Sequence, residues 1–403
     1  MKSTPALENN KKSEDPNEGK ASPKANLKQF ASSYVLLAFA LYLVLDITLR
    51  FMPADALKFS PLKVSHRSWV YWNMREFLQE TKSPDTAIFG SSLMMAALHG
   101  GDAVYLDQPQ NVCFHHKSTL FKDLMAAQGI KDDNFAFALG GQMVSDAYVL
   151  FDNMVNNNRA PKRLIYGIAP RDFMDAALPS VASTEIYKYV SRMDDLSAID
   201  LKARPSPGEK VEFAFNKASY IYGHREDFLY VQNRWAKELC KKLLGYKEMD
   251  LVKTIVHIRR QAFLELPEDS GPNEAMVCPP SMQAEPFTDN LNEYRFRYRK
   301  INWKQFNDQL SYLERLLALG QEKNVSIILV NMPLTTDNIA LMPPGFYANY
   351  MEKVEKLAAS HKARVIDLNN PQLFPTTYFA DSVHLNTRGG KHFFEVLAEK
   401  LKQ

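Results

Sequence analysis

Short apolar runs alternate with longer amphipathic segments over much of this chain. Runs rich in β-branched and other apolar residues predict five strands, over residues 86–90, 134–139, 163–168, 325–331 and 364–368. Apolar positions at helical spacing predict helices over residues 117–128, 143–157, 303–323, 346–361 and 387–402. Strands that alternate with helices form a parallel sheet covered by helices on both faces. The pattern therefore predicts an α/β fold for residues 86–403.

The N-terminal end has a different pattern. Residues 1–30 are polar and carry almost no large apolar side chains, which predicts a disordered tail. An unbroken apolar run then extends from Tyr34 to Leu45. The segment 31–52 reaches the roughly 20 residues that cross a bilayer, provided that Asp46 lies near an interface or faces a partner. We expect residues 31–52 to form a single transmembrane anchor.

The flanking residues give this anchor an orientation. Lysines of the polar tail precede the apolar run, which predicts a cytoplasmic N-terminus and a domain outside the cytoplasm, periplasmic or extracellular. Ala54-Asp55-Ala56 has the small residues of a cleavage site, so a removed signal peptide is one alternative and a buried soluble helix is another. Residues 53–85 connect the anchor to the first strand and include an amphipathic helix predicted over 68–82.

Residues 174–300 interrupt the alternation of strands and helices. They are rich in charged and aromatic side chains and contain a polar, Pro-containing stretch around 266–286. This composition predicts a mostly helical insertion with one long loop. Two interpretations are open: a solvated helical cap with a small core of its own, or a groove in which exposed aromatic and arginine side chains bind sugar.

Composition narrows the choice of function. With 403 residues, of which 46% are hydrophobic and 24% charged, the chain is typical of a globular protein. The net charge of +3 is small, and the basic residues do not gather in one run, which argues against a nucleic-acid partner. Cys113, Cys240 and Cys278 lie far apart and lack the spacing of metal ligands, and at most one disulfide can form.

Two short motifs carry residue types suited to nucleophilic catalysis. Phe89-Gly90-Ser91-Ser92-Leu93 places two serines at a glycine turn between the first strand and a helix, where open α/β folds bind their ligands. A serine is also a common helix cap at such a turn. Almost three hundred residues later, Asp381-x-x-His384 comes just before the last helix. Serine, histidine and aspartate supply the nucleophile, the base and the orienting acid of a hydrolytic triad.

These motifs resemble the first and last blocks of the SGNH (GDSL-like) hydrolase superfamily, over roughly residues 84–173 and 303–403. Gly-Ser-Ser-Leu aligned with the usual Gly-Asp-Ser-Leu makes Ser92, and not Ser91, the candidate nucleophile, with His384 as base and Asp381 as its orienting acid. The resemblance implies a flavodoxin-like, three-layer α/β sandwich. It also implies acyl transfer through an acyl-enzyme, with no metal and no cofactor.

The family stabilises the oxyanion with backbone and side-chain donors. Its glycine block matches Gly141 best, with Gly140 as the alternative, after the strand at 134–139. Ser92 itself completes the backbone donors. The family's next block is Gly-x-Asn-Asp, but this chain has Pro170-Arg171-Asp172, so the Asn donor is missing. Arg171 either replaces it as a cationic donor or pairs with Asp172 or a nearby acid.

The degenerate block is similar to that of membrane-anchored branches of the superfamily. These include the D-alanine transfer protein of teichoic-acid D-alanylation and the alginate-type O-acetyltransferases. The resemblance implies an extracytoplasmic acyltransferase or esterase that acts on a cell-surface glycan and an acyl donor. The alternative is a catalytically inactive assembly protein that docks beside a membrane-bound acyltransferase.

Overall fold

The structure is a computed structural model that describes residues 34–52, 69–174, 180–200, 202–245, 277–278 and 287–402. The chain divides into two compact units. The smaller comprises residues 1–58 and 214–225, and the larger comprises residues 59–213 and 226–403. The larger unit contains the sheet and every candidate site residue.

The centre of the larger unit is a parallel five-stranded sheet, with strand order β3-β1-β4-β6-β7. The strands are β1 (Thr86–Gly90), β3 (Asn134–Ala138), β4 (Arg163–Ile168), β6 (Ser326–Asn331) and β7 (Arg364–Asp367). By position along the chain this is the 2-1-3-4-5 order of flavodoxin-like sheets. The predicted α/β fold with a parallel sheet is therefore confirmed. A second, short antiparallel pair joins β2 (Gln110–Asn111) to β5 (Val277–Cys278).

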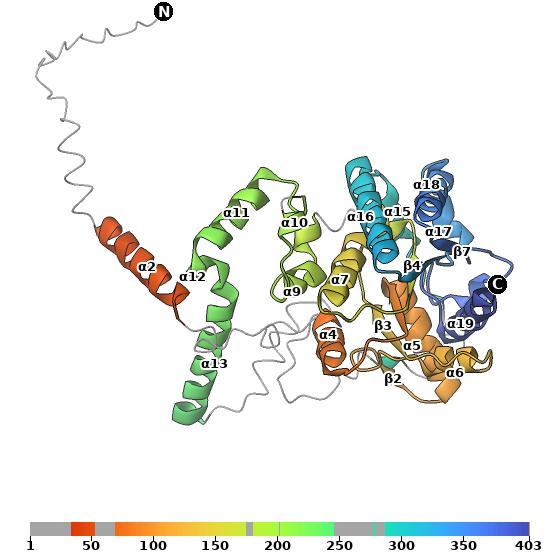
Figure 1. Cartoon of the computed structure of the whole chain (residues 1–403), viewed down its shortest axis with the longest axis horizontal. Coiled ribbons are helices and arrows are strands. Elements are labelled where there is room, and N and C mark those ends of the chain that lie inside the picture. The colour runs from red at the N-terminus through yellow and green to blue at the C-terminus, as the bar shows by residue number, and fades with distance from the viewer. Residues whose placement is uncertain are drawn as a thin grey trace, which may run out of the picture. The chain divides into compact units, whose positions relative to one another are not determined.

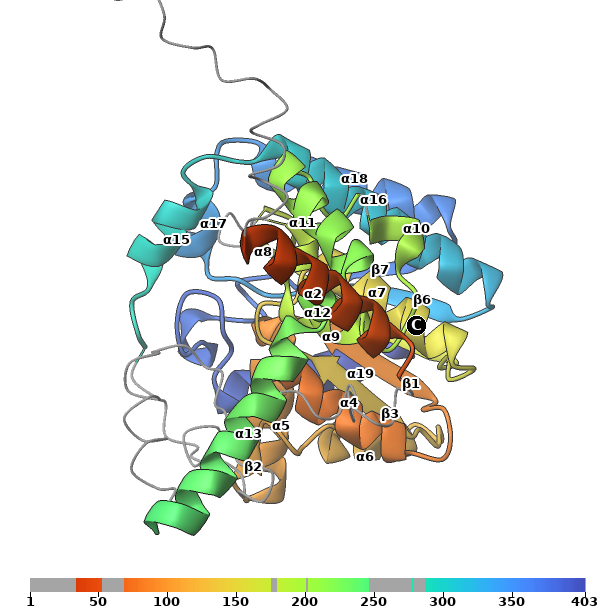
Figure 2. The same ribbon diagram turned by 90° about the vertical axis from the view of Figure 1, so that its left-hand side faces the viewer.

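Helices cover both faces of the sheet (Figure 1, Figure 2). One face carries α5 (Ser92–Leu106), α6 (Thr119–Ala126) and α19 (Thr387–Leu401). The other carries α7 (Val144–Asn156), α16 (Trp303–Glu322) and α18 (Phe346–Ser360). Helix α4 (Trp69–Gln79) packs beside β3, with Phe77 against Phe135 and Phe137. The three layers are those predicted from the alternating pattern.

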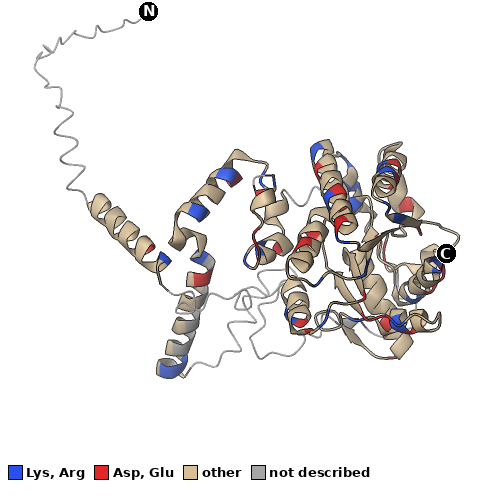
Figure 3. Ribbon diagram, in the orientation of Figure 1, with Lys and Arg blue, Asp and Glu red and all other residues tan. Residues whose placement is uncertain are grey.

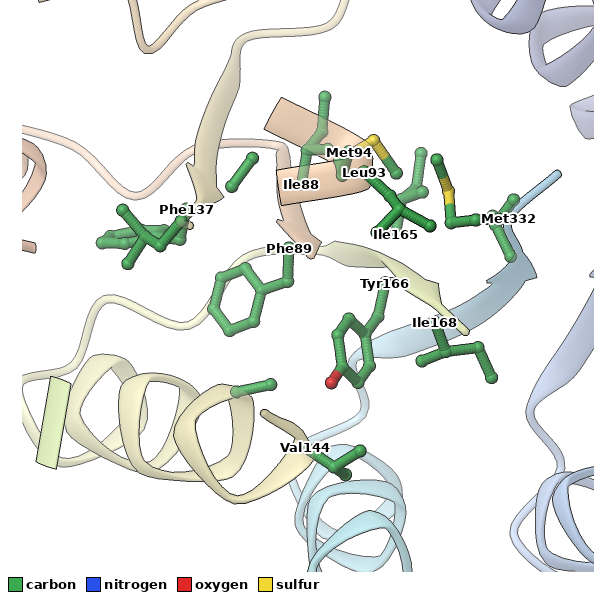
Figure 4. Close-up of a cluster of buried hydrophobic side chains, with 14 of the residues drawn as sticks. Ile88, Phe89, Leu93, Met94, Phe137, Val144, Ile165, Tyr166, Ile168 and Met332 are labelled. Atoms are coloured by element: carbon green, nitrogen blue, oxygen red, sulfur yellow. The ribbon is translucent and has the colours of Figure 1, made fainter. Parts of the chain in front are cut away.

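The core fills both sides of the sheet because every residue of β1 and β3 is buried. Alternate side chains of one strand point to opposite faces. In Figure 4, Phe89 and Tyr166 point toward the helix that begins with Val144, while Ile88 and Ile165 lie on the side of Leu93 and Met94. A strand buried on both faces has to be a continuous apolar run, which is how these strands were recognisable in the sequence.

Most element boundaries lie within two residues of the prediction. Strands 86–90 and 163–168 match β1 and β4 at both ends. The helix predicted over 117–128 is shorter, because Ser118 is the N-cap of α6 and its hydroxyl accepts a hydrogen bond from the backbone N–H of Phe121. Side-chain caps of this kind set a helix start that apolar spacing locates only roughly.

The insertion is mostly helical in its described residues. It contains α8 (Arg171–Met174) at its start, then η1 (Val181–Ser183), α9 (Glu185–Val190), α10 (Ser197–Asp200), α11 (Pro207–Ala218), α13 (Arg225–Leu244) and α15 (Leu291–Tyr298). Apart from Val277–Cys278, the loop predicted around 266–286 lies outside the described residues. The interpretation of a cap with its own core is wrong for its first helices. Their apolar side chains, such as Ile186, Tyr187 and Val190, belong to the same core as the sheet.

In the smaller unit, α2 (Tyr34–Arg50) packs against α12 (Tyr220–Gly223) through one buried carboxylate. Asp46 accepts hydrogen bonds from the Ser219 hydroxyl (2.6 Å) and from the backbone N–H groups of Tyr220 (3.1 Å) and Ile221 (2.8 Å). Elsewhere α2 is apolar and exposed, with Val35, Leu41 and Val44 at 70%, 62% and 63% exposure. Figure 3 shows the ribbon of α2 free of charge except near its C-terminal end.

The predicted transmembrane segment 31–52 requires a correction. Among the described residues, no helix is both long enough and apolar enough to cross a membrane. Helix α2 has 17 residues, fewer than the roughly 20 that a span requires. Asp46 and Arg50 also occupy its last turns, which shortens its apolar part further.

Helices α5 and α19 approach each other closely through small residues. A Cβ on Gly390 of α19 would lie 2.4 Å from the carbonyl oxygen of Ala97 and 2.9 Å from the nitrogen of Gly101, both on α5. A Cβ on Gly101 would in turn lie 3.1 Å from the backbone of Gly390. The two helices therefore meet backbone to backbone, with no room for a side chain. This matters because Ser92 begins α5 and His384 immediately precedes α19.

We expect Gly390→Ala to lower the free energy of unfolding by about 1–3 kcal/mol, because the added methyl group overpacks the contact between α5 and α19. The measurement is the denaturant midpoint and slope. Gly208→Ala on α11 is the matched control, since a Cβ at Gly208 meets no atom within 4 Å. It should be neutral or stabilising, because alanine favours a helix over glycine. Equal midpoints for the two variants would contradict the tight crossing.

Candidate active site

Ser92, His384 and Asp381 come together at the carboxyl edge of the sheet, although 292 residues separate the serine from the histidine. His384 Nε2 lies 2.8 Å from Ser92 Oγ, and His384 Nδ1 lies 2.7 Å from Asp381 Oδ2. Both distances are within hydrogen-bonding range. The histidine and aspartate side chains are 27% and 19% exposed, so the group is open to a substrate without being fully solvated.

The turn between β1 and α5 places Ser92. Ser92 is the first residue of α5, and Gly90 is the last residue of β1. A Cβ on Gly90 would lie 2.5 Å from the Cβ of Met94, so only glycine allows the helix to start this close to the strand. Strand β1 lies between β3 and β4, where the order of strands reverses. Open α/β sheets bind ligands at this switch point.

A short loop before α19 places the acid and the base. Asp381 Oδ1 accepts hydrogen bonds from the backbone N–H groups of Val383 (2.9 Å) and His384 (2.8 Å), which folds the loop back on the carboxylate. Asn386 then caps α19, with its side chain accepting from the N–H of Gly389 at 2.9 Å. The aspartate–histidine spacing is thus fixed locally, by a turn and a helix cap.

The electrostatics of Asp381 suit an orienting acid. Burial tends to raise the pKa of Asp381, but the hydrogen bond and charge of His384, together with the two backbone donors, hold it below its ordinary value. The carboxylate is therefore ionised at neutral pH and accepts a hydrogen bond from His384 Nδ1–H. That tautomer leaves Nε2 as the acceptor that faces the hydroxyl of Ser92.

The predicted oxyanion glycines lie in the loop after β3. The loop is joined to the end of β1 by a hydrogen bond from Leu139 N–H to the carbonyl of Gly90 at 2.9 Å. Gly140 packs against Trp69, whose ring a Cβ would reach at 1.9 Å, whereas a Cβ on Gly141 would meet nothing within 4 Å. Gly141 has φ of +74°, a conformation that favours glycine. Its role as an oxyanion donor stays a prediction.

Helix α5 offers a further backbone donor. Its N-cap residue, Ser91, makes no side-chain capping bond. The first N–H groups of a helix, here beginning with Ser92, have no acceptor within the helix and carry partial positive charge. Such groups bind anions and stabilise negative charge that develops on a substrate oxygen. Ser92 can therefore supply both the nucleophilic hydroxyl and one backbone donor.

Arg171 is buried, and its guanidinium is engaged with protein groups. Its Nη1 donates to the hydroxyl of Tyr294 at 2.9 Å, and its Nε lies 3.4 Å from Asp172 Oδ1. Asp172 Oδ2 also accepts from the N–H of Ala169 at 2.9 Å. Of the two roles considered for Arg171, the pairing with Asp172 is therefore present in the structure. The role of oxyanion donor stays a prediction.

Asp146 supports the glycine loop from behind. It is fully buried, accepts from the N–H of Met143 at 2.9 Å and accepts from the hydroxyl of Thr184 at 2.6 Å. Burial raises the pKa of Asp146 to about 7, against the opposing effect of these two hydrogen bonds. Since Met143 directly follows Gly141 and Gln142, this carboxyl group helps to fix the end of the predicted oxyanion loop.

Other buried acids and histidines have structural partners. Asp102 accepts at 2.9 Å from the Ser118 hydroxyl and from the N–H groups of Thr119 and Leu120, and it also contacts His115. His116 Nδ1 lies 2.7 Å from a carboxylate oxygen of Glu76. Within the part of the chain that the structure describes, no group of three or more histidine, cysteine or acidic side chains is placed to hold a metal ion.

Sequence reasoning missed several residues around the site. Asn290, Tyr294 and Asn338 contact or neighbour the catalytic loops but belong to no recognisable motif. One signal for Tyr294 was available. Tyr294 and Tyr298 lie four apart on a helix and are both buried, so they mark its inward face. Thr184 and Asn290 are isolated polar residues, and no periodic pattern in the sequence shows that their side chains face the site.

Comparisons with known proteins add little to this geometry. No family model matches the sequence, and no curated protein matches it. Three solved structures are similar at low level: the acetyl xylan esterase AlAXEase (11% identity, TM-score 0.32), the psychrotrophic esterase EstA from Pseudoalteromonas sp. (9%, 0.31) and LAE5, an alpha/beta hydrolase enzyme from the Lake Arreo metagenome (11%, 0.34). The matches cover 79–80% of this chain and 98–100% of theirs. At these TM-scores they carry no argument about chemistry.

We expect Arg171→Ala to lower the free energy of unfolding by about 3–5 kcal/mol, since it leaves the buried carboxylate of Asp172 without its cation. Thermal and denaturant unfolding measure the loss. Arg295→Ala is the matched control, because that arginine lies on the exposed side of the same α15 that carries Tyr294 and donates to Asn292. Wild-type stability in Arg171→Ala would contradict the structural pairing.

Proposed function

We propose that this protein is a serine esterase or acyltransferase of the SGNH type. The observation that carries the proposal is the pair of contacts made by His384, 2.8 Å from Ser92 Oγ and 2.7 Å from Asp381 Oδ2. A helix-capping role for Ser92 would not require a histidine beside its hydroxyl. A surface role for His384 would not require a carboxylate that orients its ring. The three side chains in this order are the parts of an acyl-transfer site.

The first half of the reaction forms an acyl-enzyme. His384 Nε2 takes the hydroxyl proton of Ser92 as the oxygen attacks the carbonyl carbon of an ester. Asp381 stabilises the imidazolium that results, and the backbone N–H groups of Ser92 and Gly141 stabilise the oxyanion. The tetrahedral intermediate then expels the alcohol, which takes the proton from His384. The acyl group is left on Ser92.

The second half returns the enzyme to its starting state. Water, in an esterase, or a sugar hydroxyl, in a transferase, gives its proton to His384 and attacks the acyl carbonyl. Ser92 leaves and regains the proton. Either acceptor takes up the acyl group and restores the proton to Ser92, so the three residues play the same roles in both activities. The acceptor is chosen by the surroundings of the site.

We further propose that the substrate is an O-acylated glycan of the cell surface and that α2 holds the protein at a membrane. A helix that is apolar on every side is stable in a protein core or in contact with lipid. The exposed apolar side chains of α2 and the withdrawal of the Asp46 carboxylate onto α12 support contact with lipid.

A fluorophosphonate probe tests the catalytic proposal. We expect it to label Ser92 in the wild type and to label neither Ser92→Ala nor His384→Ala, with Asp381→Ala milder. Hydrolysis of a small acetyl ester should fall in parallel. Ser91→Ala is the matched control, because the neighbouring Ser91 hydroxyl is buried and makes no hydrogen bond. An unlabelled wild type that binds a membrane acyltransferase would instead favour the inactive docking protein.

Co-sedimentation with phospholipid vesicles tests the membrane proposal. We expect the full chain to pellet with the vesicles, and a variant with Leu37, Leu41 and Val44 changed to serine to remain in the supernatant, because each loses exposed apolar surface that lipid would cover. Serines at Phe296, Trp303 and Leu373, which are also exposed, provide the control. A soluble wild type, or equal pelleting of both triple variants, would contradict the proposal.

A further inference from the structure

The loop that carries the acid and the base is held by a residue far away in sequence. Ser382, between Asp381 and His384, is completely buried. Its backbone N–H donates to Asn290 Oδ1 at 3.0 Å, and its hydroxyl donates to the same oxygen at 2.5 Å. Asn290 lies 92 residues earlier, where the insertion returns to the sheet domain. One amide oxygen thus receives both donors of Ser382.

The other polar groups of Ser382 are satisfied by the loop after β6. The carbonyl of Ser382 accepts from the N–H (3.2 Å) and the hydroxyl (2.9 Å) of Thr335. Asn338, on α17 (Thr336–Ala340), donates its side-chain N–H to the Ser382 hydroxyl at 3.0 Å. Ser382 is therefore clamped between two segments, and its position along the loop is fixed on both sides.

A strand-like contact reinforces the same clamp. Thr288 N–H donates to the carbonyl of Ala380 at 2.8 Å, and Thr288 forms a parallel bridge with Asp381. Because Asp381 and His384 have Ser382 between them, a shift of Ser382 changes the direction of both side chains. The segment at residues 287–290 therefore holds the loop that carries the acid and the base.

The insertion also contacts the other two loops of the site. Tyr294 on α15 accepts from Arg171, which follows β4. Thr184, which precedes α9, donates to Asp146, behind the loop that follows β3. Three of the loops at this edge of the sheet, those that follow β3, β4 and β7, are therefore joined to the insertion by side-chain hydrogen bonds.

From these contacts we infer that Asn290 is a positioning residue for the acid–base pair, and that the insertion helps to hold the loops of the active site in place. The inference rests on the proposed function for its effect on rate. For its structural effect it rests only on the hydrogen bonds of Ser382. Two kinds of measurement therefore separate it from the proposed function.

The first measurement is proton NMR of the full chain. A proton shared between His384 Nδ1 and Asp381 gives a low-field resonance, assigned by its absence in His384→Ala. We expect Asn290→Ala to shift or broaden this resonance. Ser382→Ala removes the two hydroxyl bonds, to Asn290 and from Asn338, but keeps the backbone N–H bond to Asn290, so it should have a smaller effect in the same direction.

The second measurement is the rate at which the fluorophosphonate labels Ser92. We expect Asn290→Ala to label about 10–100-fold more slowly, the usual cost of a small misplacement of catalytic groups. KM for a small acetyl ester should change little, since Asn290 lies behind the loop. Asn302→Ala is the matched control, because Asn302 caps α16 by accepting from Gln305 N–H at 3.1 Å.

The outcomes are distinct. Should Asn290→Ala and Ser382→Ala keep both the wild-type resonance and the wild-type labelling rate, the inference is overturned while the proposed function stands. Should the wild type fail to label while Asn290→Ala still displaces the resonance, the proposed function fails and the positioning role stands. If Asn290→Ala does not fold, Ser382→Ala decides, since an unchanged resonance in that variant contradicts the clamp.

Discussion

The distance between Ser92 and His384 depends on how closely two helices can approach. Helix α5 starts at Ser92, and α19 starts three residues after His384. A close contact between the two helices therefore fixes the distance between their N-terminal ends. At Gly101 and Gly390 the contact is backbone to backbone. A side chain at either position would separate the helices by more than the tolerance of a hydrogen bond. The site thus depends on an absence of side chains at Gly101, more than two turns after Ser92, and at Gly390, in the first turn of α19.

The sheet and the triad could be predicted because their signals are local. Strands buried on both faces are continuous apolar runs, so β1 and β4 were located to the residue. The serine after Gly90 and the histidine three residues after Asp381 are short motifs at strand and helix ends, and parallel strands bring such ends to one edge. The hydrogen-bond distances among Ser92, His384 and Asp381 support a catalytic role for these residues.

The surroundings of the triad could not be predicted, because they depend on single polar residues paired over long separations. Nothing in the sequence near Asn290 indicates that its amide oxygen receives both donors of Ser382. The core shared by the insertion and the sheet was also missed, since apolar positions in α9 show that a face is buried but not against what. Asp46 was recognised as a contact site, but its partner at 219–221 had no signal of its own.

The hydrogen bonds of Asp46 have a consequence for the order in which the chain acquires its structure. The carboxylate belongs to α2, the first helix among the residues that the structure describes, yet these partners lie 173–175 residues later. At roughly 5–20 residues per second, the ribosome takes about ten to thirty-five seconds to supply them. Throughout that interval these three hydrogen bonds cannot form. The N-terminal helix therefore reaches its final environment only after more than half of the chain has been made.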